Sequence, residues 1–371
     1  MKRKVLQIGY RSLANGGIQA VIMGIVRNLR NDIQFDILLF SNKAGYYDME
    51  FSEYGKIHRI PCDKTGNKFV DMYENVTRPI RSFIGTYRIL KNGGYTAVHC
   101  HNGIESGITL LAARMAKVPI RITHSHTIAI PREMNLLTKI YKRLVKSLIR
   151  TNSTIRVGCS KPAIEYLFGK QDKEAFVIPN GIDLEKFNPE KYIYKKSKNI
   201  RFIHVGRFDY EKNHLFLLEV FKEINNHMPL TELILVGFGA GEKEIREKIS
   251  ILHLEDKVKI LPHDSDIPKL FASSDYMVFP SKAEGLGLVL LEAQLMGVRC
   301  FASDNVPKES DLGLCSYFSL KERPEEWGQK IIAAIDHNES KKDSISKEKL
   351  LRVDIKTVSS KYKGIYQNTP S

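Results

Sequence analysis

The chain of 371 residues is long enough for two domains with separate hydrophobic cores, and its 43% hydrophobic and 27% charged residues are ordinary for a globular protein. Its formal net charge of +15 favours anionic partners such as phosphates, acidic lipid surfaces or nucleic acid, without choosing among them. No apolar run approaches the roughly 18 residues of a membrane-spanning helix, and the apolar stretch behind the basic start is too short for a signal peptide, so we expect a cytoplasmic protein.

Short apolar runs alternate with segments of helical period along the first half of the chain. The pattern predicts strands at 5–10, 35–42, 56–60, 97–102, 120–126, 154–160 and 175–179, with helices at 18–29 and 104–116. Alternation of this kind is typical of a parallel sheet with helices on both faces.

The second half repeats the pattern. It predicts strands at 201–206, 232–237, 257–261, 276–280 and 299–302, and helices at 213–225, 242–252, 288–296 and 324–337. The polar, lysine-rich stretch 184–199 is the expected linker between a domain at 1–183 and a domain at 200–349. A final helical segment near 350–371 is expected to pack back onto the first domain.

The most informative stretch joins the strand at 276–280 to the helix at 288–296 through a turn that holds Gly285 and Gly287. Ligands of open α/β sheets lie beyond the carboxyl ends of the strands, and a glycine turn that enters a helix offers free backbone N–H groups to a phosphate. Glu284 and Glu292 frame this turn, and carboxylates accept sugar hydroxyls well. Alternatively, Glu292 only complements the helix dipole and Glu284 is a solvated loop residue.

A second loop carries two cations, Arg207 and Lys212, directly after the strand at 201–206. Cations in this position suit a diphosphate, whose negative charge they would stabilise without a metal. The alternative is that both are ordinary surface charges.

These two stretches resemble the family-4 retaining glycosyltransferases, whose signature is E-x7-E, here Glu284 and Glu292, with a G-R-x4-K element, here Arg207 and Lys212. The resemblance implies the α/β fold called GT-B, in which two Rossmann-like doubly wound domains face each other across a cleft. It places Glu284 near the donor sugar, Glu292 on the nucleotide ribose and the two cations on the phosphates. It also implies backbone contacts to the diphosphate and sugar from Gly285, Leu286, Gly287 and Leu288.

The first domain contributes further candidates by the same resemblance. Gly16 and Gly17 follow the first strand and correspond to a glycine pair beside the donor diphosphate and acceptor, although an ordinary tight turn would also explain them. His126 ends the strand at 120–126 and fits the family's histidine that hydrogen-bonds the donor sugar or steadies positive charge, with His124 as second choice. A structural histidine is the alternative.

The implied activity is retaining transfer of a sugar from a nucleotide sugar, with a UDP-sugar expected, to a glycan or lipid-linked glycan acceptor in cell-surface polysaccharide synthesis. We expect no metal and no cofactor besides the donor. Two rival functions stay open: a non-catalytic GT-B protein that binds glycan or supports a partner, and a GT-B nucleotide-sugar epimerase. No nucleic-acid-binding module accompanies the basic charge, so nucleic acid is not an expected partner.

Three other patterns have structural explanations. His99 and His101 flank Cys100, and we discount a metal site there because neighbouring strand residues point to opposite faces. Asp264 and Asp266 mimic a DxD metal motif outside the context that the motif requires. The five cysteines are scattered without a CxxC pair, which predicts free thiols and no structural zinc site.

The segment 138–156 predicts a basic amphipathic helix without an acidic residue. Such a helix can lie on an anionic membrane surface at the inner face of the cell membrane, or it can pack its apolar side into the domain core. We favour the core. The cations of this segment are Lys139, Lys142, Arg143, Lys146, Arg150 and Arg156.

Overall fold

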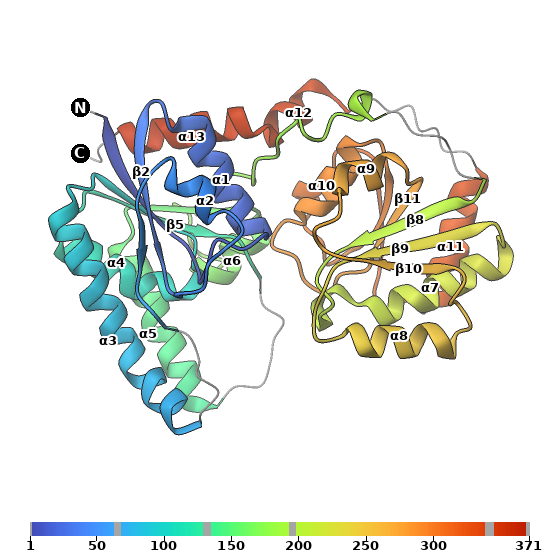
Figure 1. Cartoon of the computed structure of the whole chain (residues 1–371), viewed down its shortest axis with the longest axis horizontal. Helices are drawn as coiled ribbons and strands as arrows, with labels where there is room; N and C mark the ends of the chain where they lie inside the picture. Colours follow the sequence, from blue (N-terminus) through green and yellow to red (C-terminus); the bar gives the residue numbers. More distant parts are fainter. Residues whose placement is uncertain (1, 63–67, 129–134, 193–197, 338–344, 369–371) are drawn as a thin grey trace. The chain divides into compact units, whose positions relative to one another are not determined.

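The computed structural model describes residues 2–62, 68–128, 135–192, 198–337 and 345–368 (Figure 1). The chain divides into two compact units, which we call the first unit (1–181 with 352–371) and the second unit (182–351). The predicted linker 184–199 includes residues 193–197, which lie outside the described residues. Each unit is built on one parallel sheet, so the α/β fold with two Rossmann-like doubly wound domains is confirmed.

The first unit has a seven-stranded sheet in the order β3-β2-β1-β4-β5-β6-β7. Its strands are β1 (Arg3–Ile8), β2 (Ile33–Leu39), β3 (Ile57–Arg59), β4 (Ala97–Cys100), β5 (Ile120–Ser125), β6 (Ile155–Gly158) and β7 (Phe176–Val177). Its helices are α1 (Gly17–Leu29), α2 (Asp48–Ser52), α3 (Lys68–Gly93), α4 (Ser106–Met115), α5 (Leu136–Asn152), α6 (Lys161–Phe168) and α13 (Ile355–Gln367), which follows α12 (Lys347–Val353). Figure 1 shows α1 and α13 on one side of this sheet and α3, α4 and α5 on the other.

The second unit has a six-stranded sheet in the order β10-β9-β8-β11-β12-β13. Its strands are β8 (Ile200–Val205), β9 (Thr231–Val236), β10 (Val258–Leu261), β11 (Tyr276–Phe279), β12 (Arg299–Ser303) and β13 (Cys315–Phe318). Its helices are α7 (His214–His227), α8 (Glu242–Ile251), α9 (Ile267–Ala272), α10 (Leu288–Leu295) and α11 (Pro324–Asp336). The core between sheet and helices is aromatic, with Phe202, Phe221, Phe301 and Trp327 fully buried.

The strand order reverses direction once in each sheet, between β1 and β4 and between β8 and β11. In an open parallel sheet the loops that follow the two strands at a reversal turn to opposite faces, which leaves a crevice at the carboxyl ends of the strands. All the candidate site residues except His126, which follows β5, come after these same strands. The topology therefore brings them to the places where such sheets bind ligands.

Helix α13 explains why the end of the chain belongs to the first unit. The Asp354 carboxylate accepts from the backbone N–H groups of Lys356 and Thr357 and so begins the helix. Gly24 of α1 has no side chain, and a Cβ atom there would lie 2.8 Å from Cδ1 of Ile355, so the glycine permits close packing of α1 and α13. Tyr362 and Tyr366 of α13 are fully buried against the sheet.

Helix α5 packs only partly as expected. Val145, Ile149 and Asn152 are buried, and they share one side of the helix. The expectation that the apolar side enters the core is wrong for the first half of the helix, where five apolar side chains are exposed: Leu136, Leu137, Ile140, Tyr141 and Leu144.

Candidate functional site

The loops that follow β8 and β11 lie together because these strands are parallel neighbours. The backbone N–H of Lys282 donates to the carbonyl of Glu211 at 2.8 Å, and the side-chain amide of Asn213 donates to the carbonyl of Pro280 at 3.1 Å. These two hydrogen bonds join the loops into one rigid surface at the reversal point of the second sheet.

Lys212 and Glu284 form an ion pair on this surface, with Nζ of the lysine 2.5 Å from Oε1 of the glutamate. Only 17% of the lysine side chain and 10% of the glutamate side chain are exposed. The ammonium also lies 5.2 Å from the ring centroid of Phe279, the last residue of β11. Lys212 and Glu284, which belong to different sequence motifs, therefore form one ion pair that is largely shielded from water.

Arg207 behaves differently from Lys212. Its side chain is 69% exposed and pairs with Asp209 across 2.8 Å. Burial raises the pKa of Asp209, and the charge of Arg207 opposes that rise. An exposed pair of this kind is worth little, so the guanidinium can leave Asp209 for a ligand at small cost.

Gly287 sets the start of α10. Its φ of +83° lies in the left-handed region that glycine adopts without strain, and no side chain caps the helix at this position. The first amide groups of a helix have no partner within the helix, so those at the start of α10 are available to an acceptor. The neighbouring candidates Gly285, Leu286 and Leu288 flank this residue, and Leu286 is buried.

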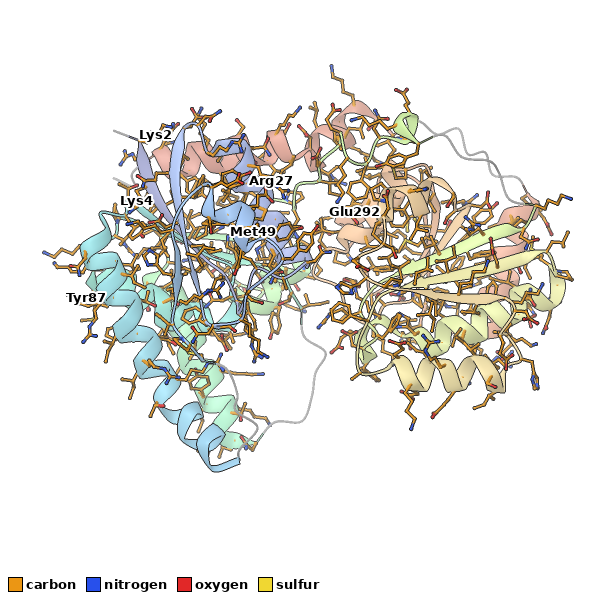
Figure 2. The ribbon with its side chains drawn as sticks, viewed as in Figure 1. Lys2, Lys4, Arg27, Met49, Tyr87 and Glu292 are labelled. Atoms are coloured by element: carbon orange, nitrogen blue, oxygen red, sulfur yellow. The ribbon has the colours of Figure 1, made fainter. Side chains whose placement is uncertain are left out.

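Glu292 lies one turn inside α10 (Figure 2). The surrounding protein displaces water from its carboxyl and raises its pKa to about 7, and the positive charge of Lys186 opposes that rise. Near neutral pH this carboxyl therefore exchanges between an ionised and a protonated form.

The glycine-rich stretch after β9 has a packing explanation. A Cβ atom at Gly237 would lie 2.0 Å from the carbonyl oxygen of Gly206, and one at Gly239 would lie 2.5 Å from that of Phe208. The glycines let this loop pack closely against the loop after β8. Asp266 of the DxD-like pair caps α9, because its side chain accepts from the backbone N–H of Lys269.

Four histidines form a buried cluster at the carboxyl ends of β4 and β5 in the first unit. His99 lies in β4, and His101 directly follows that strand on the same face, since residues two apart in an extended segment share a face. His124 lies in the neighbouring β5, and His126 directly follows it. Nδ1 of His101 lies 2.8 Å from Nε2 of His126, whose other nitrogen lies 3.1 Å from the side-chain oxygen of Asn180.

Helix α13 completes this cluster. The hydroxyl of Tyr366 lies 2.6 Å from Nδ1 of His99, and the hydroxyl of Tyr362 lies 3.0 Å from Nδ1 of His124. The side-chain amide of Gln7 links α13 to the histidines. Its nitrogen donates to the Tyr366 hydroxyl at 3.1 Å, and its oxygen lies 2.8 Å from Nε2 of His101.

Burial lowers the pKa of all four histidines, that of His126 to about 4, so they are neutral at neutral pH. Alternation along β4 separates Cys100 from the histidines, as expected, but it does not separate the histidines from one another. His99, His101 and His124 each place one ring nitrogen within 4.8 Å of the others. The direct link from His101 to His126 does not follow from the sequence pattern, because strand register decides it.

Gly16 and Gly17 begin α1 at the reversal point of the first sheet. Gly16 has an extended backbone, and a Cβ atom there would lie 2.7 Å from Oε1 of Gln19. The Gln19 amide in turn donates to the carbonyl of Ser12 at 3.2 Å. The absence of a side chain at Gly16 therefore leaves room for the Gln19 side chain that makes this hydrogen bond.

A cavity of about 400 Å³ lies in the first unit among the ends of β2 and β4 and the helices α3 and α5. Its lining joins Phe40 and Asn102 from the strand ends to Tyr141 of α5 and an ion pair in which Nη2 of Arg78 lies 2.6 Å from Oε1 of Glu105. Aromatic, amide and charged groups together can bind a polar ligand such as a sugar. No sequence motif marked this cavity.

The five cysteines are free, four of them buried, as expected. In the part of the chain that the structure describes, no helix has the length and apolar character needed to cross a bilayer.

Comparisons with known proteins cover both units. Residues 15–186 match the family model Glycosyltransferase Family 4, and residues 187–349 match the model Glycosyl transferases group 1. The protein named "Putative glycosyltransferase EpsF" of Bacillus subtilis is 31% identical over 93% of this chain and 91% of its own. The capsular polysaccharide biosynthesis glycosyltransferase CapH of Staphylococcus aureus is 28% identical over 98% of this chain and 99% of its own. An Escherichia coli relative, named as a UDP-Gal:alpha-D-GlcNAc-diphosphoundecaprenol alpha-1,3-galactosyltransferase, is 29% identical over 78% of this chain and 76% of its own.

Solved structures agree on the fold. HepE of Anabaena in complex with UDP and glucose superimposes with a TM-score of 0.74 over 98% of both chains at 19% identity. Sucrose-phosphate synthase of Thermosynechococcus elongatus gives a TM-score of 0.79 at 16% identity, over 99% of this chain and 98% of that one. With two Rossmann-like units, a matching model on each and a relative of full length, the chain belongs to the family-4 glycosyltransferases of GT-B fold.

Proposed function

We propose that this glycosyltransferase uses a nucleotide sugar, with a UDP-sugar as the expected donor, and transfers the sugar with retention to a lipid-linked glycan in cell-surface polysaccharide synthesis. The observation that carries the proposal is the protected pair of Lys212 and Glu284 beside the uncapped start of α10. Support for the donor and acceptor comes from the relatives, whose names include UDP-Gal, diphosphoundecaprenol and capsular polysaccharide.

The second unit would hold the donor. Arg207 and Lys212 bind the diphosphate, and the backbone of Gly285, Leu286, Gly287 and Leu288 contacts diphosphate and sugar. Glu292 accepts hydrogen bonds from the ribose hydroxyls, and Glu284 lies at the sugar. Because the two cations neutralise the leaving group, the proposal includes no metal and no cofactor besides the donor.

In the reaction, the bond from the anomeric carbon to the diphosphate oxygen breaks and its electron pair stays on the diphosphate. The acceptor hydroxyl oxygen bonds to the anomeric carbon on the face that the diphosphate leaves, and its proton passes to that diphosphate oxygen. In the first unit, neutral His126 would exchange one of its two ring contacts, to His101 or to Asn180, for a hydrogen bond to the donor sugar and steady the positive charge that develops on the ring. Gly16 and Gly17 would lie at the diphosphate and acceptor.

The proposed place of action is the cytoplasmic face of the cell membrane, where a lipid-linked acceptor presents its sugars. The cavity of the first unit, with Tyr141, Asn102 and the Arg78–Glu105 pair, offers groups that suit those sugars. Nucleic acid has no role in this proposal.

A thermal-shift screen of the full chain against nucleotides and nucleotide sugars would name the base and narrow the sugar. Nucleotide release is then measured with and without a synthetic undecaprenyl-diphosphate-linked sugar. Release that depends on this acceptor would support transfer. Interconversion of nucleotide sugars without release would indicate an epimerase, and binding without turnover would indicate a non-catalytic protein.

Single-residue variants distinguish a loss of catalysis at the site from a general effect of removing a charged side chain. We expect Glu284→Gln and Lys212→Gln each to lower kcat/KM by about 10²–10³-fold, the usual loss when a group that stabilises transition-state charge is removed. Lys248→Gln is the matched control, because Lys248 forms a similar pair with Glu219 at 2.5 Å between α8 and α7. An equal loss in the control would contradict the assignment.

A further inference from the structure

A chain of buried polar side chains connects α13 to His126. Gln7 lies in β1, and its amide nitrogen donates to the Tyr366 hydroxyl while its oxygen lies 2.8 Å from Nε2 of His101. Nδ1 of His101 lies 2.8 Å from Nε2 of His126. All four side chains are buried, and we call them the hydrogen-bond chain. Because Gln7 and His101 each bridge two neighbours, the position of the proton at one group determines its position at the next.

The hydroxyl of Tyr366 decides which end of the Gln7 amide faces His101. It lies 2.6 Å from Nδ1 of His99, which is closer than the about 2.7–3.2 Å of an N–H donor and within the range of an O–H donor. Tyr366 therefore gives its proton to His99, and the tyrosine oxygen accepts from the nitrogen of Gln7. The oxygen of Gln7 is left to accept from His101.

This direction fixes the protons of both histidines. Burial lowers the pKa of His101 and His126, so each ring is neutral and carries one proton. His101 donates from Nε2 to Gln7, which makes its Nδ1 an acceptor. His126 must then donate from Nε2 to that nitrogen, which leaves a lone pair at its own Nδ1. The side-chain oxygen of Asn180 lies 3.1 Å from Nδ1, but an amide oxygen cannot donate to it.

We infer that Gln7 is a positioning residue for the proposed reaction: through His101 it holds the proton of His126 on Nε2, so that Nδ1 accepts from a hydroxyl of the donor sugar in place of Asn180. The inference rests on the proposed function for the sugar, whereas the proton position belongs to the ligand-free protein. The contact to Asn180 is the one exchanged, because the contact to His101 is a complete hydrogen bond. A lone pair that faces the sugar also suits a ring that becomes positive during transfer.

The first test is the ¹⁵N spectrum of the full chain labelled at histidine, without ligand, in which protonated and unprotonated ring nitrogens resonate far apart. The signals lost in His126→Gln identify His126. We expect the wild type to carry the His126 proton on Nε2. Gln7→Leu should move it to Nδ1, because His101 then lacks an acceptor for a proton on Nε2. In the reversed direction His101 donates to His126, and His126 donates to the oxygen of Asn180.

Turnover separates positioning from a role in folding. Gln7→Leu should lower kcat for acceptor-dependent nucleotide release by about tenfold, the loss expected for one hydrogen bond, while the Kd of UDP, which has no sugar, should stay within about twofold. Ser125→Ala is the matched control. It removes a buried hydrogen bond of 2.7 Å to the carbonyl of Ala163, directly beside His126, without altering the hydrogen-bond chain. The control should keep both the wild-type proton position and the wild-type kcat.

A wild-type His126 with its proton on Nδ1 would overturn the inference, and this spectrum decides alone if Gln7→Leu does not fold. A Gln7→Leu protein that keeps the proton on Nε2, or that moves it and retains wild-type kcat, would also overturn it. The proposed function fails separately. A proton on Nε2 without turnover of any nucleotide sugar would contradict the activity and leave the proton position standing.

Discussion

At the scale of single residues, two lysine–glutamate pairs of the second unit have the same length but differ in how far they are buried. The side chains of Lys212 and Glu284 are 17% and 10% exposed, whereas those of Lys248 and Glu219 are 26% and 39% exposed, although both pairs are 2.5 Å long. A charge that is shielded from water depends on its partner far more than an exposed charge does. Loss of Lys212 would therefore leave the Glu284 carboxylate unpaired and poorly hydrated, which would destabilise the fold.

Lys212→Ala should lower the free energy of unfolding by about 1–3 kcal/mol, because it leaves the Glu284 carboxylate without its partner. Adding Glu284→Gln should restore part of that loss, since no unpaired charge then remains. Urea denaturation at neutral pH measures both, with Lys248→Ala as the control, which should cost less than about 1 kcal/mol. If adding Glu284→Gln lowered the free energy of unfolding further, the ion pair would not explain the effect of Lys212→Ala.

Glu292 links stability to pH. Its folded pKa of about 7 lies above the ordinary glutamate value of 4.5, so the folded protein keeps a proton that the unfolded chain has lost. The stabilising contribution is complete below the unfolded pKa and disappears as the pH rises through about 7. Glu292→Gln cannot ionise, and in the absence of ligand we expect it to exceed the wild type in stability at about pH 8, by on the order of 2 kcal/mol. Thermal unfolding at about pH 5 and 8 measures the difference.

The same carboxyl should make donor binding depend on pH. A nucleotide sugar is the right probe, because its diphosphate keeps its charge through this range. Wild-type affinity should rise as the pH passes through about 7 and Glu292 ionises, whereas the affinity of Glu292→Gln should be weaker at pH 8 and flat. Glu247→Gln, with its side chain 61% exposed, is the control and should follow the wild type. A rising profile in Glu292→Gln would assign the titration to another group.

At the scale of elements, α13 depends on a glycine beneath it. A Cβ atom at Gly24 would press on Ile355, whereas one at Gly364 within α13 would meet no atom within 4 Å. We expect Gly24→Leu to destabilise the first unit by about 1–3 kcal/mol through overpacking, and Gly364→Ala to stabilise it by about 0.4–1 kcal/mol through the lower entropy of the unfolded chain. Circular dichroism during thermal unfolding measures both shifts, and a loss of stability in Gly364→Ala would contradict the packing described for α13.

The local sequence pattern was sufficient to predict elements where strand, turn and helix follow each other directly. The strand predicted at 276–280 and the helix predicted at 288–296 correspond to β11 and α10, because a buried apolar run, two glycines and a second apolar run mark all three parts. The long helix α3 was not predicted, since Pro79 interrupts its pattern, and the strand β13 was not predicted although it is as long as β11.

Contacts between distant elements were beyond the sequence. The pairing of Lys212 with Glu284 needs β8 beside β11, and the histidine cluster needs both the register of β4 against β5 and the return of α13. Neither strand order nor register follows from the hydrophobic pattern of a single chain. The exposure of Leu137 and Leu144 was hidden for the same reason, because helical spacing shows which side chains share a face but not what that face meets.

At the scale of the whole molecule, the same reversal of strand order occurs once in each unit. Each sheet reverses its strand order beside its first strand, at β1 and at β8, and all the candidate residues except His126 follow the strands at that point. The units differ in continuity, because the first unit includes residues from both ends of the chain while the second is one uninterrupted segment. The stability of the first unit must therefore depend on the last helix.

A chain that ends at Leu351 tests this dependence. It lacks Tyr362 and Tyr366, so His99 and His124 lose their hydroxyl partners, and it lacks the buried Ile355 and Val358. These losses sum to on the order of 10 kcal/mol, which is comparable with the whole stability of a domain. Hydrogen exchange should show lost protection in the peptides of β1, β4 and β5 but retained protection in those of β8 and β11.

The full-length double variant Tyr362→Phe, Tyr366→Phe is the control for this truncation. It removes the two hydroxyls but keeps the apolar contacts of α13, so its first unit should stay folded and lose about 1–3 kcal/mol for each orphaned histidine nitrogen. Full protection of the β4 and β5 amides from hydrogen exchange in the truncated chain would show that α13 contributes little to the stability of the first unit. Lost protection in β8 and β11 would show instead that the second unit needs the same helix, contrary to the division of the cores.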